Sequence, residues 1–412
     1  MSIDAILAAA KAAKAVVAAY TEDERNAILE SMATALTQNS NAILAANQQD
    51  IENATGRIAD VMIDRLRLDQ ERIAAMAKGI RDVAALQSPL GHVENEFTNA
   101  DGLKISKVRV PVGVVAIIYE SRPNVTTDAA ALCLKSGNVC ILRGGSDAIC
   151  TNTAIAQSLA AALAANGAPA GTVQLVTDTS HDSARLLMEA RGSVDLLIPR
   201  GGKNLIRAVV EGAKGVPVIE TGTGICHVYV DKDADLAMAA NIVYNAKTSR
   251  PSVCNSAEVC LVHRDVAAAF LPEVQKLLHQ KQVELRLDSR AAAIIDGSPA
   301  TPDDFDTEFL DYILAIAVVD SLQDAIAHIN QHSTGHSDAI ITANPAAATA
   351  FLTQVDSAAV YHNASTRFTD GGVFGLGCEM GISTQKIGAR GPMGLYELTS
   401  YKYTIQGTGQ TR

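Results

Sequence analysis

The sequence predicts an α/β protein with two successive α/β domains behind a helical N-terminal segment. Two observations carry this prediction. From Gly113 onward, short uninterrupted apolar runs alternate with helical segments, and the same alternation starts again near Ile225. Strands that are buried on both faces have this pattern, so we expect parallel sheets with right-handed helical crossovers. With 412 residues and 48% hydrophobic content, the chain is long enough to bury the cores of two domains or more.

The N-terminal segment, residues 2–90, has apolar residues at a spacing of about 3.6 positions, which is typical of amphipathic helices. Polar breaks at residues 21–24 and 38–41 divide this segment, and Ser88-Pro89-Leu90-Gly91 ends it. We therefore expect several helices before the first strand.

A β-hairpin is expected next. Asp101-Gly102 lies between Phe97-Thr98 and an alternating run at residues 103–110, and this dipeptide favours a tight hairpin turn. Residues 398–405 alternate in the same way. We expect them to form a strand that pairs either with the exposed hairpin edge or with a neighbouring subunit.

The same alternation of apolar runs and helical segments predicts the elements of both α/β regions. In the first region the expected strands and helices are, in order, residues 114–118, 127–135, 139–142, 147–165, 173–176, 180–190, 194–198, 204–212 and 216–219. In the second region they are residues 228–230, 236–246, 259–262, a helix that Asp265 caps, and then 313–319, 324–330, 339–341 and 358–361.

Composition and charge exclude several classes of protein. The net charge of −11 and the pI near 5.3 argue against a nucleic-acid partner, because binding phosphates requires clustered lysines and arginines. Asp4, Lys11 and Lys14 interrupt the alanine-rich N-terminus, which favours an amphipathic helix over a signal peptide, and no run predicts a membrane span. Seven cysteines, mostly inside apolar segments, suit a reducing compartment, so we expect a cytoplasmic protein.

Cys254 is the strongest candidate for a chemically active residue. It lies in the polar turn Arg250-Pro251-Ser252-Val253-Cys254-Asn255-Ser256, just before an apolar strand, where a thiol can be reached and ionised. A thiolate needs a nearby cation or oriented amides to lower its pKa, and Arg250 and the turn can supply both. The alternative at this point is a loop cysteine without a role.

Two turns between a strand and a helix are suited to phosphate. Arg143-Gly144-Gly145-Ser146 and Arg200-Gly201-Gly202-Lys203 each place glycines and a basic side chain at a helix N-terminus. Each alone is compatible with an ordinary βα turn, but two in one sheet favour a dinucleotide. Leu197 and Asn204 break the pattern of a phosphate-binding NTPase loop, and no Gly-x-Gly-x-x-Gly occurs.

Three other motifs are better explained by structure than by chemistry. His328, His332 and His336 recur every four residues, a spacing that can bind a metal, but Gly335 should end the helix before the third histidine. Cys226-His227 enters a strand and is expected to be buried. The run Gly375-Leu376-Gly377-Cys378-Glu379-Met380-Gly381 misses the dinucleotide spacing by one residue and is expected to be a tight loop.

Taken together, motifs along nearly the whole chain resemble the aldehyde dehydrogenase superfamily and, within it, the γ-glutamyl phosphate reductase family. The stretches that carry the resemblance are Tyr119-Glu120-Ser121-Arg122-Pro123-Asn124-Val125, residues 142–146, Ile198-Pro199-Arg200-Gly201-Gly202, Ile219-Glu220-Thr221-Gly222-Thr223-Gly224, residues 249–258, residues 363–372 and Ala389-Arg390-Gly391-Pro392. The family has a histidine before the last of these motifs, whereas this chain has Gly388, which leaves the role of that loop open.

The resemblance implies roles for individual residues. Cys254 matches the nucleophile, and Asn124 matches the asparagine whose amide helps to hold the oxyanion. For the cofactor, Arg143 and Ser146 fall where relatives contact the adenosine ribose, and Glu308 falls where they bind the nicotinamide ribose. We add Gly201 and Gly202 to the cofactor site as the phosphate-binding turn. Glu220 aligns with the glutamate that activates water in aldehyde-oxidising members.

The same resemblance implies a fold of three parts. We expect a Rossmann-type dinucleotide-binding domain of residues 1–94 and 111–221 with 373–394, and a catalytic α/β domain of residues 222–372. Residues 95–110 and 395–412 should form a small β flap for oligomerisation. The expected partners are a small-molecule substrate, a second copy of the chain and, by pathway analogy, glutamate 5-kinase in a transient contact. No nucleic acid, membrane or metal is expected.

The implied reaction is the NADPH-dependent reduction of L-glutamyl 5-phosphate, in proline biosynthesis, through a thioester on Cys254. NADP(H) is expected because Arg143 is positively charged where a 2′-phosphate would lie. Phosphate and α-carboxylate groups call for guanidinium groups, and the motif loops offer Arg122, Arg250, Arg367 and Arg390. Three alternatives stay open: an aldehyde-oxidising dehydrogenase, a cysteine hydrolase with His263 as its base, and a non-enzymatic scaffold.

Overall fold

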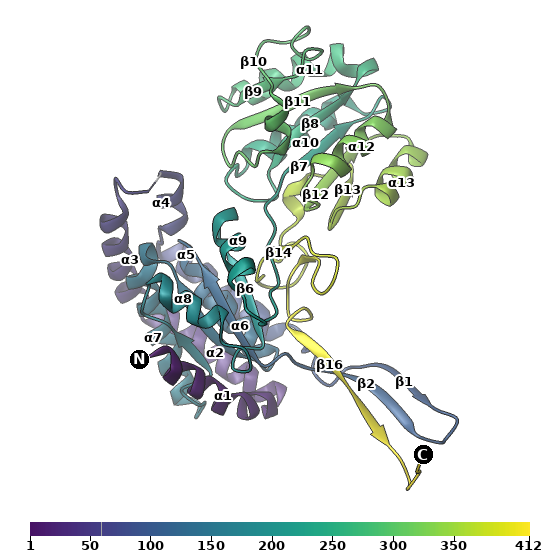
Figure 1. Ribbon diagram of the computed structural model, residues 1–412. Coiled ribbons are helices and arrows are strands. Elements are labelled where there is room, and N and C mark those ends of the chain that lie inside the picture. Colours follow the sequence, from purple (N-terminus) through teal and green to yellow (C-terminus); the bar gives the residue numbers. More distant parts are fainter. Residues whose placement is uncertain (59) are drawn as a thin grey trace. The chain divides into compact units, whose positions relative to one another are not determined.

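The computed structural model describes residues 1–58 and 60–412 and divides the chain into two compact units. Unit 1 comprises Met1–Thr221, Gly375–Gly381 and Met393–Arg412, and unit 2 comprises Gly222–Phe374 and Ile382–Pro392. Each unit has its own sheet, as Figure 1 shows. The boundary at residues 221 and 222 lies inside the motif Ile219-Glu220-Thr221-Gly222-Thr223-Gly224.

Unit 1 begins with helices and continues as an α/β sheet. Its central sheet is parallel and has the strand order β5-β4-β3-β6. Its N-terminal helices are α1 (Ile3–Ala19), α2 (Glu22–Gln38), α3 (Ser40–Ala54), α4 (Asp60–Leu66) and α5 (Gln70–Ala85). Its later elements are β3 (Val114–Tyr119), α6 (Pro123–Lys135), β4 (Val139–Gly144), η1 (Ser146–Ala148), α7 (Ile149–Ala165), β5 (Val173–Leu175), α8 (His181–Met188), β6 (Leu196–Arg200) and α9 (Lys203–Gly212).

The apolar runs explain why this sheet forms. All residues of β3 and β4 are buried, as expected for parallel strands covered by helices on both faces. The expected strand at residues 216–219 is the exception. In the described structure it makes one parallel bridge, from Val218 to Leu197 of β6, with backbone hydrogen bonds of 2.9 Å from Leu197 to Pro217 and 3.0 Å from Ile219 to Leu197. The predicted strand is therefore present only as this short bridge along β6.

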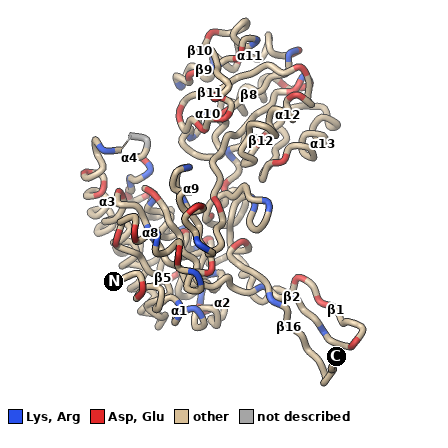
Figure 2. Tube along the Cα trace, viewed as in Figure 1, with Lys and Arg blue, Asp and Glu red and all other residues tan. Residues whose placement is uncertain are grey.

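The flap is an antiparallel sheet of β1 (Val93–Thr98), β2 (Lys104–Pro111) and β16 (Thr399–Gln406). The hairpin prediction is confirmed, and the C-terminal strand pairs with β2 of its own chain along its whole length. Both signs of charge lie on β1 and β2 (Figure 2), and Glu94 is bonded to Lys107 and Arg109. Apolar and aromatic side chains remain exposed here, including Phe97, Tyr401 and Ile405.

Unit 2 is a second α/β sheet with the strand order β10-β9-β11-β8-β7-β12-β13, parallel throughout. Its elements are β7 (Cys226–Val230), α10 (Leu236–Thr248), β8 (Ala257–His263), α11 (Arg264–His279), β9 (Glu284–Leu287), β10 (Ser298–Pro299), η2 (Pro302–Asp306), β11 (Ile313–Val319), α12 (Leu322–His332), β12 (Ser337–Ile341), α13 (Pro345–Gln354), β13 (Ala359–His362), η3 (Thr366–Phe368), β14 (Ile382–Ser383) and β15 (Gly391–Pro392).

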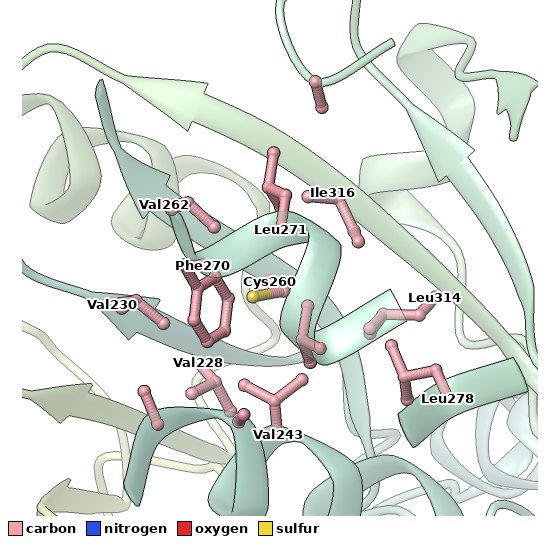
Figure 3. Close-up of a cluster of buried hydrophobic side chains, with 14 of the residues drawn as sticks. Val228, Val230, Val243, Cys260, Val262, Phe270, Leu271, Leu278, Leu314 and Ile316 are labelled. Carbon is pink, nitrogen blue, oxygen red and sulfur yellow. The ribbon is translucent and has the colours of Figure 1, made fainter. Parts of the chain in front are cut away.

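Unit 2 has two core clusters, one between its sheet and the helices α10 and α11 and one between the sheet and the helices α12 and α13. Figure 3 shows Phe270 and Leu271 of α11 packed on Cys260 of β8 and Val228 of β7. The cap of α11 differs from the prediction. His263, not Asp265, is the N-cap residue, because the His263 Nδ1 accepts the Asp265 backbone N–H at 3.2 Å while Asp265 lies in the first turn.

Residues 382–392 lie in unit 2, whereas the sequence analysis assigned residues 373–394 to the dinucleotide-binding domain. Two contacts explain their position. The strands β14 and β15 pair with each other, and Arg390 and Lys386 both bind Asp356 of unit 2. Residues 375–381 do belong to unit 1, where Gly375, Gly377 and Gly381 adopt positive φ angles and form the expected loop.

One described stretch, Ser146–Ala165, is long and apolar enough by composition to cross a membrane. In the structure it is a core helix of unit 1. Its buried Thr151 donates a hydrogen bond of 2.6 Å to Asp50 of α3, and its buried Asn152 lies within 3.1 Å of Thr126 of α6. Burial within the domain accounts for its apolar composition.

Candidate active site

The first part of the candidate site is a cavity in unit 1 at the carboxyl ends of β3, β4 and β6. Its volume is about 630 Å³, and Glu120, Arg143, Ser146, Asp147 and Lys214 are among its lining residues. This volume is in the range of sites for small molecules and cofactors. In open parallel sheets, ligands bind at this end of the strands. The two predicted phosphate turns lie at this same end, since they follow β4 and β6.

Arg143 is the last side chain of β4 before the glycine turn, and it is held firmly. Its Nη2 donates to the carbonyls of Thr179 and Ser180 at 2.6 and 2.8 Å, and its Nε donates to Ser183 at 3.4 Å. Burial lowers the pKa of Arg143, which the nearby Asp178 opposes. The guanidinium thus fixes the loop before α8 and leaves Nη1 as the group that could meet a phosphate.

The turn Gly201-Gly202 precedes α9, and Gly202 is the N-cap residue of this helix. Glycine provides no capping side chain. Instead, the Gly202 backbone N–H donates a hydrogen bond of 2.9 Å to Oε2 of Glu120, the residue that follows β3. A carboxylate oxygen therefore lies at the predicted phosphate turn, a contact that the sequence analysis did not anticipate.

Asn124 lies at the N-terminus of α6, and its amide is oriented by a residue one helical turn later. Its Nδ2 donates to Oδ2 of Asp128 at 2.9 Å, which leaves the second Nδ2–H for another acceptor. Burial raises the pKa of Asp128 to about 6, although the hydrogen bonds from Asn124 and Cys378 oppose this shift. Cys378 belongs to the glycine-rich loop, so this loop supports the orientation of Asn124 through Asp128.

The perturbed carboxyl predicts a specific pH dependence of stability. Because the folded-state pKa of Asp128 lies above its ordinary value of 3.8, the folded protein binds this proton more tightly than the unfolded chain. The resulting stabilisation is present below about pH 4 and is lost as the pH rises through 6. Compared with wild type, Asp128→Asn is expected to gain about 1–3 kcal/mol of unfolding free energy between pH 4 and pH 8. Urea unfolding of both proteins at several pH values measures this difference, and a difference independent of pH would contradict the assignment.

The second part of the candidate site is the Cys254 loop of unit 2, between α10 and β8. Cys254 is partly exposed, as the sequence analysis expected, whereas Cys226 and Cys260 of the same unit are buried. Several contacts hold the loop. The Cys226 thiol donates to the Cys254 carbonyl at 3.2 Å, Ser256 donates to the Ala246 carbonyl at 3.1 Å, and Asn255 donates to the Thr369 carbonyl at 2.8 Å. The thiol is therefore presented on a well-fixed backbone.

Glu308 and Gly224 lie close to this loop. The Gly224 backbone N–H donates to Oε1 of Glu308 at 2.8 Å. A Cβ atom on Gly224 would lie 1.5 Å from the Cys254 carbonyl oxygen, so only glycine permits this approach. The structure thus brings Cys254, Gly224 and Glu308 together within unit 2, three residues from three separate sequence motifs.

A buried ion pair beside the loop was missed by the sequence analysis. Lys247, near the end of α10, bonds Oε2 of Glu258 at 2.5 Å, and both side chains are fully buried. The other oxygen, Oε1, accepts the backbone N–H of Leu310 at 3.3 Å, and Leu310 has a φ of +56°. Burial raises the pKa of Glu258 to about 8 and lowers that of Lys247, while each charge opposes the shift of the other.

The four candidate arginines have different surroundings. Arg367 bonds Ser249 at 3.0 Å and also contacts the Asn255 side chain, so it lies against the Cys254 loop. Burial lowers its pKa, and the nearby charge of Arg250 lowers it further. Arg122 is the N-cap residue of α6, next to Asn124 in sequence. Arg390 is bound by Asp356 at 2.8 Å.

Gly388 has a φ of +92°, and a Cβ atom at this position would meet no neighbour within 4 Å. The space would accept a histidine side chain, but the backbone conformation favours glycine.

The cysteine hydrolase alternative fails on geometry. Cys254 precedes β8, whereas His263 is the last residue of this seven-residue strand. Because a strand rises roughly 3.3 Å per residue, the histidine lies about 20 Å from the start of β8. The histidine series is also divided, since α12 ends at His332 and His336 lies beyond it. In residues 1–58 and 60–412, no group of three or more His, Cys, Asp or Glu residues is placed to hold a metal ion.

The chain is similar to several known proteins. The aldehyde dehydrogenase family model matches residues 1–300 and 291–402. A γ-glutamyl phosphate reductase from Streptococcus gordonii is 60% identical over 418 residues, which cover 100% of this chain and 99% of the relative. One from Neisseria meningitidis is 58% identical and covers 98% of both chains. The crystal structure of a γ-glutamyl phosphate reductase from Thermotoga maritima superposes with a TM-score of 0.95 at 44% identity and covers 100% of both chains.

Proposed function

Because the chain belongs to the aldehyde dehydrogenase family, in its γ-glutamyl phosphate reductase branch, we propose that it reduces L-glutamyl 5-phosphate to L-glutamate 5-semialdehyde with NADPH. Phosphate is released in this reaction, which would place the enzyme in proline biosynthesis. The observation that carries the proposal is the Cys254 loop, which presents a partly exposed thiol on a backbone held by three hydrogen bonds.

The chemistry follows from what an acyl phosphate requires. The Cys254 thiolate attacks the γ-carbonyl carbon, and the amide of Asn124 and the backbone N–H of Cys254 stabilise the oxyanion. Phosphate departs with the electrons of the C–O bond and leaves a γ-glutamyl thioester on sulfur. Arg250 and Arg367, which neighbour this loop, supply positive charge for the anionic groups of the substrate.

When bound, the nicotinamide cofactor would supply the hydride that reduces the γ-glutamyl thioester, and the Cys254 sulfur would then leave as the thiolate when the aldehyde is released. The chain's residues fit this cofactor. The cavity in unit 1 has the volume of a cofactor site, α9 begins at the glycine turn of Gly202, and Arg143 lines the wall. We assign Ser146 to the adenosine ribose and Glu308 to the nicotinamide ribose. The charge of Arg143 supports a preference for NADP(H) over NAD(H).

The direct test runs the reaction in reverse. The protein is mixed with glutamate 5-semialdehyde and NADP⁺, with or without inorganic phosphate, and reduced cofactor is followed by absorbance. We expect NADPH to accumulate beyond one equivalent per active site only when phosphate is present, because phosphate is needed to release the acyl group. Equal rates without phosphate would favour the alternative, an aldehyde-oxidising dehydrogenase in which water attacks the thioester.

A variant of Glu220 also distinguishes the acyl-phosphate reductase from the aldehyde-oxidising dehydrogenase. In an acyl-phosphate reductase an activated water would hydrolyse the thioester, so a general base is not needed. Glu220→Gln is therefore expected to change the rate of reduction by no more than about twofold. Steady-state kinetics of the variant with L-glutamyl 5-phosphate generated in situ measure this effect, and a collapse of the rate would assign Glu220 a direct role.

The setting of the enzyme follows from the same proposal. We assign it to the cytoplasm, as a homo-oligomer that pairs through the flap of β1, β2 and β16. The apolar and aromatic side chains exposed on the flap support such an interface. Because acyl phosphates hydrolyse readily, a transient contact with glutamate 5-kinase would protect the substrate. Sedimentation of wild type against a variant lacking residues 399–406 tests the oligomer.

A further inference from the structure

We propose that Glu120 is an internal anion that occupies the phosphate turn of α9 and that the cofactor's diphosphate has to displace it. Glu120 would then set the affinity of the enzyme for its cofactor by competing with it. This inference rests on the proposed function, because it takes NADP(H) as the ligand of the cavity in unit 1.

The position of Glu120 follows from the sheet. Glu120 comes directly after β3, and β6, which ends at Arg200, is its parallel neighbour. The Glu120 backbone N–H donates to the Arg200 carbonyl at 3.1 Å, so the two strand ends stay aligned. From there the half-buried side chain reaches the turn that follows β6, where Oε2 lies 2.9 Å from the Gly202 backbone nitrogen. Glu120 also lines the cavity.

The turn is built to receive an anion. Helix α9 has ten residues, and its N-cap residue Gly202 has no side chain that could accept a hydrogen bond from the first backbone N–H groups. These N–H groups and the helix dipole favour an anion at this end of the helix. A Cβ atom on Gly201 would lie 2.5 Å from Glu120 Oε2. A glycine at this position therefore allows an anionic oxygen to approach the turn, and in the structure that oxygen belongs to Glu120.

The backbone that carries Glu120 is strained and firmly held. Ser121 has a φ of +30°, which is uncommon for a residue with a side chain, and it is 3% exposed. Its hydroxyl donates to Asp147 of η1 at 3.2 Å. Strained residues persist where the surrounding contacts impose them, and they are common at ligand sites. The strand end is thus kept in a conformation that directs Glu120 to the phosphate turn.

The energetic consequence is a competition between like charges. A diphosphate that binds the Gly202 amide would meet the Glu120 carboxylate at contact distance, where repulsion is strong in a partly buried site. The carboxylate must leave the turn before the diphosphate can bind, and this cost weakens the observed affinity. An amide at this position keeps the size and one acceptor oxygen but removes the charge.

The experiment compares NADPH affinity in three proteins, measured by the change in NADPH fluorescence on binding. Glu120→Gln is expected to lower the Kd for NADPH about tenfold relative to wild type. Glu211→Gln is the matched control, because it removes the same charge from α9 at the end of the helix opposite to Gly202. Its Kd is expected to stay within about twofold of wild type. Circular dichroism establishes that all three proteins are folded.

Each other outcome has a clear meaning. An unchanged or higher Kd for Glu120→Gln, with normal binding by wild type, would overturn the inference and make Glu120 a cap of α9 or a cofactor ligand. Equal tightening by Glu211→Gln would also overturn it, because the effect would then come from net charge and not from the contact with Gly202. If wild type itself does not bind NADPH, the proposed function fails and the competition fails with it.

Discussion

Replacing Cys254 with serine is expected to abolish the reduction of L-glutamyl 5-phosphate, with a loss of more than about 10³-fold in kcat. A serine hydroxyl is far less ionised than a thiol near neutral pH, and His263, the base of the hydrolase alternative, lies at the other end of β8. The substitution changes one atom of a partly exposed side chain, so the fold should be unaffected. Initial rates of NADPH consumption measure the loss.

The matched control is Cys150→Ser, which alters a cysteine of similar partial exposure in unit 1. Cys150 begins α7 beside Asp50, and burial raises the pKa of its thiol. We expect this variant to retain the rate of the wild type. Substantial activity in Cys254→Ser, or an equal loss in Cys150→Ser, would show that Cys254 is not the nucleophile.

The second large effect concerns stability. Lys247→Met is expected to lower the free energy of unfolding by about 3–5 kcal/mol at pH 8, because it leaves the Glu258 carboxylate buried without its counter-charge. The effect should be smaller at pH 6. Since the pKa of Glu258 is raised to about 8, its carboxyl can take up a proton at the lower pH and relieve the unpaired charge. Urea unfolding followed by circular dichroism at both pH values measures the difference.

The double variant Lys247→Met with Glu258→Met distinguishes two roles of the ion pair, its contribution to stability and its hydrogen bond to Leu310 near Glu308. Apolar side chains of similar length can replace a buried ion pair with little cost, so the double variant should be more stable than Lys247→Met alone. It also removes the acceptor of the Leu310 N–H, two residues from Glu308. We therefore expect its KM for NADPH to rise even where stability is restored. A double variant that unfolds as readily as the single one would contradict this account.

The strand and helix pattern could be predicted because burial on both faces leaves a strong mark on a sequence. The wholly buried strands β3 and β8 appear as uninterrupted apolar runs, and they were expected within one or two residues. Residues 216–219 are equally apolar, yet only Val218 bridges to the sheet. Only Val216 of this run is buried, so an apolar run by itself decides neither burial nor strand pairing, which depend on tertiary packing.

The candidate site could be predicted in part. Cys254 and the two glycine turns stand out because reactive thiols and phosphate turns depend on short contiguous motifs. The contacts of Glu120 with Gly202 and of Lys247 with Glu258 could not be predicted from such motifs. They join residues that do not share a motif and are brought together by the sheet or by the packing of a helix on a strand. The sequence does show a lysine in an apolar helix and a glutamate near the start of a buried strand, but neither residue indicates that the other is its partner.

The central claim is that Cys254 carries the acyl group, and intact-protein mass spectrometry tests it most directly. The protein is incubated with glutamate 5-semialdehyde and NADP⁺ in the absence of phosphate, so that the acyl-enzyme forms but cannot be released. We predict a mass increase of one γ-glutamyl group, located on the peptide that contains Cys254, absent in Cys254→Ser and lost when phosphate is added. An adduct on another residue, or an adduct that persists in Cys254→Ser, would contradict the account.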